Sequence, residues 1–330
     1  MPNTTRPPTP GAPTAAPSAP TAAPSVQTAA ALMPTAAPEA PRTATAAPDI
    51  RLLALDIDGT LTAGNNVYSA ATIAAVHAAR AAGIEVLLAT SRRYRTTRIA
   101  IDALRIDAHA VCLGGALTKD AAQTTIASRA IPPATAAAAI TLARTHQLAM
   151  ICQLDNRPGA NRDFIIDAVV DWGPDTQHYF ALGAAHGQRG DALAALPTTP
   201  PITLGIYGTE AALARYDAAL HTAIASAALD PIVTHLVPAH ITANAYLEII
   251  AAQVSKWTGV AALAAHFAIE VRQICAIGDA RNDLPLLTNA GLSIAMANAP
   301  DDVRERCDWV TGSAADDGVA TAIAHLLALR

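Results

Sequence analysis

From residue 50 onward, short apolar runs alternate with longer stretches in which apolar positions recur at helical spacing. Uninterrupted apolar runs of this kind are typical of strands buried on both faces of a sheet. Strands that alternate with helices predict right-handed βαβ units, which build a parallel sheet with helices on both faces. The strands are expected at 51–55, 84–89, 110–113, 273–277, 292–295 and 308–311, and clear helices at 69–82 and 319–329.

The middle of the chain, roughly 131–245, has a different pattern. Alanine-rich helical stretches at 134–145 and 210–227 occur among strand-like runs and loops without a regular alternation. We interpret this region as an α+β cap domain, inserted into an α/β core that comprises 49–130 and 246–330. Candidate strands lie at 149–154, 163–167, 202–207, 232–236 and 246–250, the last of which leads back into the core.

The first 48 residues have a composition of their own. The tetrapeptide Thr-Ala-Ala-Pro occurs at 14–17, 21–24, 35–38 and 45–48. Proline at this density blocks helices, and alanine and threonine offer little apolar area to offset the entropy of ordering. We expect 1–48 to be a disordered tail, partly in polyproline II conformation. Both a docking segment for a protein partner and an inert extension fit this composition.

Composition narrows the classes of function. A chain of 330 residues with 52% apolar content can hold two domains, and a net charge of −5 argues against a general nucleic-acid surface. The four cysteines have no CxxC spacing and the ten histidines no HxxH spacing, so zinc is not indicated. No apolar run approaches the roughly 18 residues of a membrane span, and no signal peptide is visible. We therefore expect a reduced, cytoplasmic protein.

The segment Asp56-Ile57-Asp58-Gly59-Thr60 carries the most distinctive chemistry. Two acids lie two residues apart at the end of a predicted buried strand, and the carboxyl edge of such a sheet is where ligands bind. Gly59 permits the chain to turn there. Taken alone, the segment would also fit an ordinary Asp-Gly turn that ends a strand.

A second polar segment, Ala89-Thr90-Ser91-Arg92, follows the next predicted strand. It brings a hydroxyl, backbone N–H groups and a guanidinium to the same edge. Such donors suit the oxygens of a phosphoryl group. A Ser/Thr cap beside a solvated arginine is the alternative interpretation.

Two later segments supply further charges. Lys256, in Val254-Ser255-Lys256, begins a predicted helix, where a cation opposes the helix dipole unless an anion lies nearby. Asp279, Asn282 and Asp283 follow the strand that ends at Ile277, and grouped acid and amide oxygens suit a hard cation. An Asp/Asn-rich helix cap is the alternative for this last group.

In order and context, these four segments resemble the motifs of the haloacid dehalogenase-like (HAD) superfamily of phosphohydrolases. They are most similar to its Cof-type branch, in which a large α/β cap is inserted between the second and third motifs. The stretches 295–299 and 317–319 also resemble that branch, so the likeness covers about 50–330. The resemblance implies a HAD-like Rossmannoid parallel sheet with helices on both faces, plus an inserted α+β cap domain.

The resemblance also implies catalytic roles. Asp56 would be the nucleophile that forms an aspartyl-phosphate. Asp58 would be the general acid that protonates the leaving group and later activates water. Thr90 and Lys256 would hold the phosphoryl oxygens.

Further phosphate and substrate contacts are implied at four positions. Backbone N–H groups near Ile57 and Ser91 would bind phosphoryl oxygens, and Asn282 would reach the substrate or the phosphate. Arg92 is the best placed member of a local arginine cluster to bind a second anionic group of the substrate.

The cofactor implied is Mg²⁺. It would bind the Asp56 carboxylate, the Asp58 backbone carbonyl and Asp279, and Asp283 would support the metal site or orient Lys256. Such a cation is needed because a phosphate dianion repels a carboxylate nucleophile.

Three positions depart from the pattern of the branch. Ser91 and Trp257 stand where glycine is usual, and Gly114 stands where an asparagine usually precedes Gly-Ala. None of these removes a catalytic group. Gly114 and Trp257 bear on the floor and entrance of the substrate pocket, so they bear on which substrate is accepted.

The sequence therefore predicts a Mg²⁺-dependent phosphatase of small phosphate monoesters, such as sugar phosphates or related metabolites. Sugar phosphates, phosphorylated vitamins and nucleotide-derived monoesters all remain open as substrates. Two alternatives also remain: a phosphomutase with the same nucleophile, and a binding or regulatory protein that kept the fold without the reaction. Neither a nucleic-acid partner nor a membrane is expected.

Overall fold

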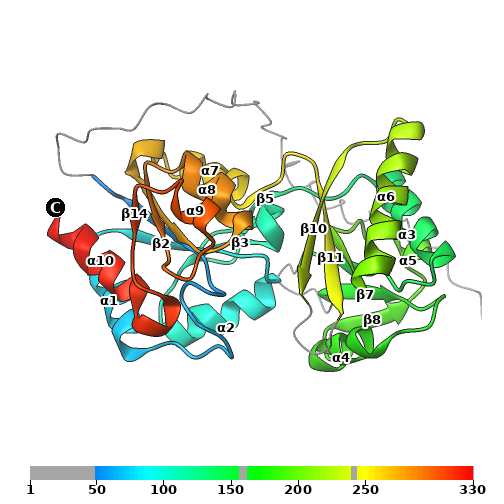
Figure 1. Ribbon diagram of the computed structural model, residues 1–330, viewed down its shortest axis with the longest axis horizontal. Helices are drawn as coiled ribbons and strands as arrows, with labels where there is room; N and C mark the ends of the chain where they lie inside the picture. Colours follow the sequence, from blue (N-terminus) through cyan, green and yellow to red (C-terminus); the bar gives the residue numbers. More distant parts are fainter. Residues whose placement is uncertain (1–48, 156–161, 239–243, 330) are drawn as a thin grey trace, which may run out of the picture. The chain divides into compact units, whose positions relative to one another are not determined.

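The computed structural model describes residues 49–155, 162–238 and 244–329. These residues contain two β-sheets and the helices that pack on them (Figure 1). The expected tail at 1–48, and with it any partner of that tail, lies outside the described residues.

One sheet forms the α/β core. Its strands are β1 (Leu52–Leu55), β2 (Glu85–Ala89), β3 (His109–Cys112), β4 (Leu117–Lys119), β5 (Thr125–Ser128), β12 (Ile274–Gly278), β13 (Leu292–Ala295) and β14 (Trp309–Val310). Their order is β14-β13-β12-β1-β2-β3-β4-β5. The pairings from β14 to β3 are parallel, and β4 and β5 extend the β3 edge in antiparallel orientation.

Helices cover both faces of this sheet because its central strands are apolar on both sides. Leu53 and Leu55 of β1 belong to one core cluster, and Leu52 and Ala54 to the other. The first cluster includes residues of the helices α1 (Ala70–Ala81), α2 (Tyr94–Leu104) and α10 (Gly318–Ala328). The second includes residues of α7 (Lys256–His266), α8 (Leu284–Asn289) and α9 (Asp301–Arg304).

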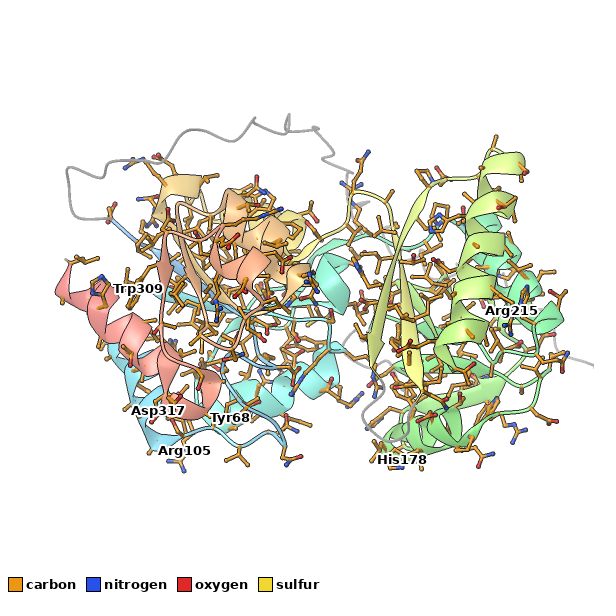
Figure 2. The ribbon with its side chains drawn as sticks, viewed as in Figure 1. Tyr68, Arg105, His178, Arg215, Trp309 and Asp317 are labelled. Carbon is orange, nitrogen blue, oxygen red and sulfur yellow. The ribbon has the colours of Figure 1, made fainter. Side chains whose placement is uncertain are left out.

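The helix ends follow the expected local chemistry. Ser69 caps α1, since its side chain accepts a hydrogen bond from the Thr72 N–H. Figure 1 shows α1 next to α10. At the sheet edge, Trp309 (labelled in Figure 2) packs on His325 of α10, with ring centroids 4.4 Å apart.

The second sheet lies in the inserted region. Its strands are β6 (Ile151–Gln153), β7 (Phe164–Asp167), β8 (Gly187–Gly190), β9 (Thr203–Gly208), β10 (Ile232–Pro238) and β11 (Ala245–Ala251), in the order β10-β11-β9-β6-β7-β8. All pairings except β7 with β8 are antiparallel. The associated helices are α3 (Pro133–Thr145), α4 (Pro174–Gly183), α5 (Ala192–Ala195) and α6 (Glu210–Ser226), and residues of α3 and α6 share a core with this sheet.

Most expected elements are present, and the differences have local causes. The strands β4, β5 and β8 were not predicted because they are short and polar, as in Gly187–Gly190 with the sequence Gly-Gln-Arg-Gly. Such strands depend on their neighbours rather than on an apolar pattern. Since β11 pairs with β9 and β10, we propose that the inserted domain extends to about residue 251 and that the core resumes at α7.

The cysteines are free thiols, and three of them, Cys112, Cys152 and Cys275, are buried. Among the helices of the described ranges, none has the length and apolarity required to cross a lipid bilayer.

Candidate active site

The carboxyl edge of the core sheet gathers four segments that are far apart in the sequence. Asp56 directly follows β1, and Thr90 directly follows the neighbouring β2. Asp279 follows β12, which pairs with β1 on the other side. Lys256, the first residue of α7, reaches the same place. The predicted convergence of these segments is therefore observed, because parallel neighbours end at one edge.

The centre of the site is a buried lysine between two carboxylates. The Lys256 Nζ lies 2.6 Å from the Asp56 Oδ1 and 2.6 Å from the Asp283 Oδ1. All three side chains are almost fully buried. The lysine is strongly held in this place, because its removal would leave two buried carboxylates without a compensating charge.

The start of α7 determines where Lys256 lies. Ser255 caps the helix and forms a capping box with Thr258. Gly115, with φ of +110°, lies directly beneath: a Cβ there would fall 1.9 Å from the Ser255 carbonyl oxygen. Only glycine allows this approach, so the loop after β3 and the beginning of α7 can touch.

Asp279 is held from three directions. The Thr60 hydroxyl donates to its Oδ1 at 2.9 Å, and the Asn298 Nδ2 lies 3.3 Å from its Oδ2. Asn298 also donates to the Gly59 carbonyl oxygen at 2.8 Å. A Cβ at Gly59 would fall 2.2 Å from the Asp279 Oδ2, so the turn after β1 packs directly on this carboxylate.

Asp283 connects the lysine with the chain after β12. Its Oδ1 accepts from Lys256, while its Oδ2 accepts from the backbone N–H groups of Asp279 (3.1 Å) and Ala280 (3.0 Å). Both oxygens therefore have partners. This arrangement fixes the position of Lys256 relative to Asp279.

The carboxylates of Asp56, Asp279 and Asp283 form the acidic cluster of the site. Each offers an oxygen, and these oxygens lie within 4.8 Å of one another. Three carboxylates face one lysine here, so the cluster has an excess of negative charge. Oxygen ligands of this number and charge fit a hard divalent cation such as Mg²⁺.

Burial and crowding shift the pKa values of the cluster. Burial raises the pKa of Asp56 well above its usual range; Lys256 counteracts this, and the neighbouring Asp283 and Asp279 add to the rise. Burial, together with Asp283, raises the pKa of Asp279 to about 6. The two carboxylates raise the pKa of Lys256 against the opposing effect of burial, so the lysine stays cationic. A bound cation would favour the ionised carboxylates.

Asp58 lies outside this buried cluster. Its side chain is 58% exposed and accepts two hydrogen bonds from Arg92, at 2.7 Å from Nε and 2.5 Å from Nη2. Arg92 also donates to the Asn66 side chain at 2.5 Å. The guanidinium thus holds Asp58 in one orientation at the open side of the site.

The remaining expected phosphate-binding residues line the segment after β2. Thr90 is buried, and its Oγ1 accepts the Arg92 N–H at 3.1 Å. The Asn282 Nδ2 lies 3.4 Å from the Ser91 Oγ, and its Oδ1 is buried without a hydrogen-bond partner among the described residues. The Ile57 side chain is fully buried in the core, which leaves its backbone as the group that can bind a ligand.

Apart from Ile57, the expected site residues thus contribute side chains to one place, the carboxyl edge of the core sheet. We call this edge the rim of the site. Trp257, one of the departures from the family pattern, packs against the core cluster under α7. Sequence reasoning assigned no role to Thr60, Asn298 or Glu248, although each lies at this edge. For Glu248 a signal existed, namely an acid in an otherwise apolar predicted strand.

The fold defines an α/β protein whose acidic, lysine-containing candidate active site lies at the carboxyl edge of its sheet. A family model described as haloacid dehalogenase-like hydrolase matches residues 53–323. The chain belongs to this family of haloacid dehalogenase-like hydrolases.

Individual proteins agree with this assignment. Stress response protein YhaX of Bacillus subtilis is 26% identical over 275 residues, which are 82% of this chain and 91% of that protein. The 5-amino-6-(5-phospho-D-ribitylamino)uracil phosphatase YcsE of the same organism is 24% identical over 277 residues, 84% of this chain and 96% of the relative.

Among solved structures, a phosphatase of the haloalkanoate (HAD) enzyme superfamily from Bacteroides thetaiotaomicron has a similar fold. Its TM-score is 0.67 at 23% identity, with 89% of this chain and 100% of that chain covered. The predicted family, fold class and enzyme class, a hydrolase of the HAD type, are therefore confirmed.

Proposed function

We propose that the chain is a Mg²⁺-dependent phosphatase of small phosphate monoesters that works through an aspartyl-phosphate on Asp56. The observation that carries this proposal is the contact of Lys256 with both Asp56 and Asp283 at 2.6 Å, beside Asp279. A buried nucleophilic carboxylate needs such a positive neighbour before it can approach a phosphate dianion.

In the first step, an Asp56 oxygen attacks phosphorus and the bond from phosphorus to the ester oxygen breaks. Asp58 gives its proton to the departing alkoxide. In the second step, water attacks the aspartyl-phosphate while Asp58 takes a proton from it, so that inorganic phosphate leaves and Asp56 is regenerated. Two displacements allow one acid to serve in both directions.

The position of Asp58 supports this role. It lies on the exposed side of the rim, where a leaving group can reach it, whereas Asp56 is 4% exposed. The two hydrogen bonds from Arg92 orient its carboxyl group. Arg92 would also bind a second anionic group of the substrate. Its hydrogen bonds to Asp58 would then be replaced by hydrogen bonds to that group.

The transferred phosphoryl group would be held by several donors. Lys256, the Thr90 hydroxyl and the backbone N–H groups near Ile57 and Ser91 would bind its oxygens. The Asn282 amide, beside Ser91, would contact the phosphate or the adjoining part of the substrate. Transfer through a loose transition state depends on such positioning more than on strong nucleophilicity.

Mg²⁺ would be held by the Asp56 carboxylate, the Asp58 backbone carbonyl and Asp279, with Asp283 in the same cluster. It would supply charge neutralisation between the nucleophile and the phosphate. Because both oxygens of Asp283 already accept hydrogen bonds, we infer that this residue acts mainly by positioning Lys256 and Asp279.

The substrate would be a small phosphorylated metabolite, such as a sugar phosphate. An inserted cap domain favours small substrates, since a lid excludes bulk water and large polymers. The relative YcsE is named for a substrate with a phosphorylated ribityl group, which supports a polyhydroxylated metabolite. The free thiols of the buried cysteines support a reducing, cytoplasmic setting.

A simple assay tests the proposal. Wild-type protein is incubated with p-nitrophenyl phosphate and Mg²⁺, with a parallel sample in excess EDTA. Release of p-nitrophenolate that requires Mg²⁺ supports a phosphatase. Absence of release in both samples would indicate a protein that kept the fold without the reaction. A requirement for a bisphosphate activator would identify a phosphomutase instead.

A further inference from the structure

Glu248 brings a carboxylate from the cap sheet to the catalytic rim. It lies in the middle of β11, where Leu247 and Ile249 belong to the cap core with residues of α6. Because side chains alternate along a strand, Glu248 lies on the opposite face of the sheet.

On that face, Glu248 meets the loop that follows β3 of the core. The position of a Cβ at Gly114 would lie 3.8 Å from the Glu248 Oε2, 4.0 Å from its Oε1 and 3.9 Å from the Ser91 Oγ. Ser91 in turn lies 3.4 Å from the Asn282 amide. The Glu248 carboxylate and the Ser91 hydroxyl therefore border the same open position above Gly114, and Ser91 is one of the residues proposed to hold the phosphate.

The carboxylate has no protein partner there. Glu248 is only 9% exposed, yet its oxygens form no hydrogen bond or ion pair with any residue in the described ranges. Burial raises its pKa to about 7, with Lys256 counteracting. A largely buried carboxylate without a protein donor gains a favourable interaction when a donor binds.

Gly114 leaves open the space that a side chain would fill. Its φ of +65° is left-handed, and of the larger residues asparagine tolerates this conformation best. Contacts of 3.8 to 4.0 Å are ordinary van der Waals distances, so there is room for a Cβ. An asparagine amide here would be within reach of the Glu248 carboxylate and would supply the missing donor.

We propose that Glu248 is a substrate-recognition residue, which accepts hydrogen bonds from hydroxyl groups on the alcohol part of the phosphate ester in the space left open by Gly114. The substrate class is thus a phosphate monoester with hydroxyl groups close to the ester, as in a sugar-alcohol or sugar phosphate. This inference rests on the proposed phosphatase function and adds the residue that selects the leaving group.

The test compares two substrates that differ only in hydroxyl groups: sorbitol 6-phosphate and n-hexyl phosphate. The quantity measured is the ratio of their kcat/KM values with Mg²⁺ present. In Glu248→Ala this ratio is expected to fall about tenfold or more, the size expected for loss of a hydrogen bond to a charged group. Glu248→Gln, which keeps the volume, is expected to lower the ratio less.

Matched variants separate recognition from general damage. Gly114→Asn should lower the ratio, because its amide fills the open space and donates to the Glu248 carboxylate. Gly114→Ala introduces the same backbone strain and only a methyl group without a donor, so it should lower the ratio less than Gly114→Asn. Glu210→Ala removes an exposed carboxylate at the start of α6 and should keep the ratio unchanged. Thermal unfolding verifies that each variant is folded.

The outcomes are distinct. An unchanged ratio in folded Glu248→Ala overturns the role of Glu248 while leaving the phosphatase proposal intact. An unchanged ratio in folded Gly114→Asn overturns the role assigned to the open space. Absence of hydrolysis of both substrates and of p-nitrophenyl phosphate by the wild type overturns the proposed function itself.

Discussion

The Nζ of Lys256 lies 2.6 Å from the Oδ1 of Asp56, although 200 positions separate the two residues in the sequence. One follows the central strand β1, and the other begins the helix after the inserted domain. The strands β2 to β5 of the core sheet and the entire second sheet lie between these two contacting residues in the sequence. The site forms only when the core sheet and α7 are assembled, which couples the chemistry to the folding of the core.

Lys256→Met should abolish turnover and destabilise the protein. Loss of the ammonium leaves Asp56 and Asp283 as neighbouring buried carboxylates, at a cost of about 3–5 kcal/mol in the free energy of unfolding. The measurements are p-nitrophenyl phosphate hydrolysis with Mg²⁺ and urea unfolding in EDTA.

Lys119→Met is the matched control. Lys119 is also fully buried, donates to the Thr125 hydroxyl at 2.7 Å and lies 3.1 Å from the Asp155 Oδ1. The Lys119→Met variant should lose a comparable free energy of unfolding. It should keep its turnover under conditions in which it remains folded. If both variants lost turnover equally, the role of Lys256 would be structural only.

Asp56→Asn should lower kcat by at least about a thousandfold, as expected when a covalent nucleophile is removed. Its thermal midpoint should not fall, because the pKa of Asp56 is raised by burial and by nearby carboxylates and a neutral side chain relieves that crowding. Turnover close to that of the wild type would contradict the mechanism.

Mg²⁺ should raise the thermal midpoint of the wild type. At about 100 times its Kd, a ligand that binds only the folded state adds about 2.7 kcal/mol. Asp279→Asn should lose most of this response, since it removes a charge from the acidic cluster. Asp308→Asn, where the acid instead accepts from Ser293, should retain it. An equal response in all three proteins would place the cation elsewhere.

Asp58→Asn should separate two kinds of substrate. Single-turnover release of p-nitrophenolate needs little acid assistance and should persist, whereas hydrolysis of alkyl phosphates should fall about 10²- to 10⁴-fold. The control is Asp302→Asn. Like Asp58, Asp302 accepts two hydrogen bonds from an arginine, in this case Arg281. Equal losses on both substrates in Asp58→Asn would argue against a general acid.

Glu248→Gln should stabilise the protein in a pH-dependent way. Burial raises the pKa of Glu248 in the folded state to about 7, from an ordinary value of 4.5. The folded state then binds more protons than the unfolded state between these values, so this residue makes the wild type less stable as pH rises through that window. The size of the effect is about 1.4 kcal/mol per pH unit at most.

Glutamine does not titrate, so the thermal midpoint of Glu248→Gln relative to wild type should increase from pH 5 to pH 8. Differential scanning calorimetry at both pH values measures this. The same difference at both values would mean that Glu248 stays ionised in the folded protein throughout.

Many strands and helices of the core were predictable because short stretches of the sequence determine them. The run 51–55 is apolar enough to be a buried strand in any context, and the structure has β1 at Leu52–Leu55. Ser69 and Gly83 likewise bound a helix by their own backbone chemistry, and α1 begins and ends beside them. By contrast, β4 and β8 exist only because β3 and β7 offer free edges.

The sequence by itself determined which polar and ionisable side chains are present. Through the alternation of strands and helices, it also determined that Asp56, Thr90 and Asp279 share a sheet edge. Only the tertiary structure decided how these groups pair. The hydrogen bonds of Lys256 to Asp56 and Asp283, the hold of Arg92 on Asp58, and the approach of Glu248 to Gly114 all join residues from separate elements. Periodicity reports which face of an element is buried, whereas distances between side chains depend on how whole elements pack, and no local pattern contains that information.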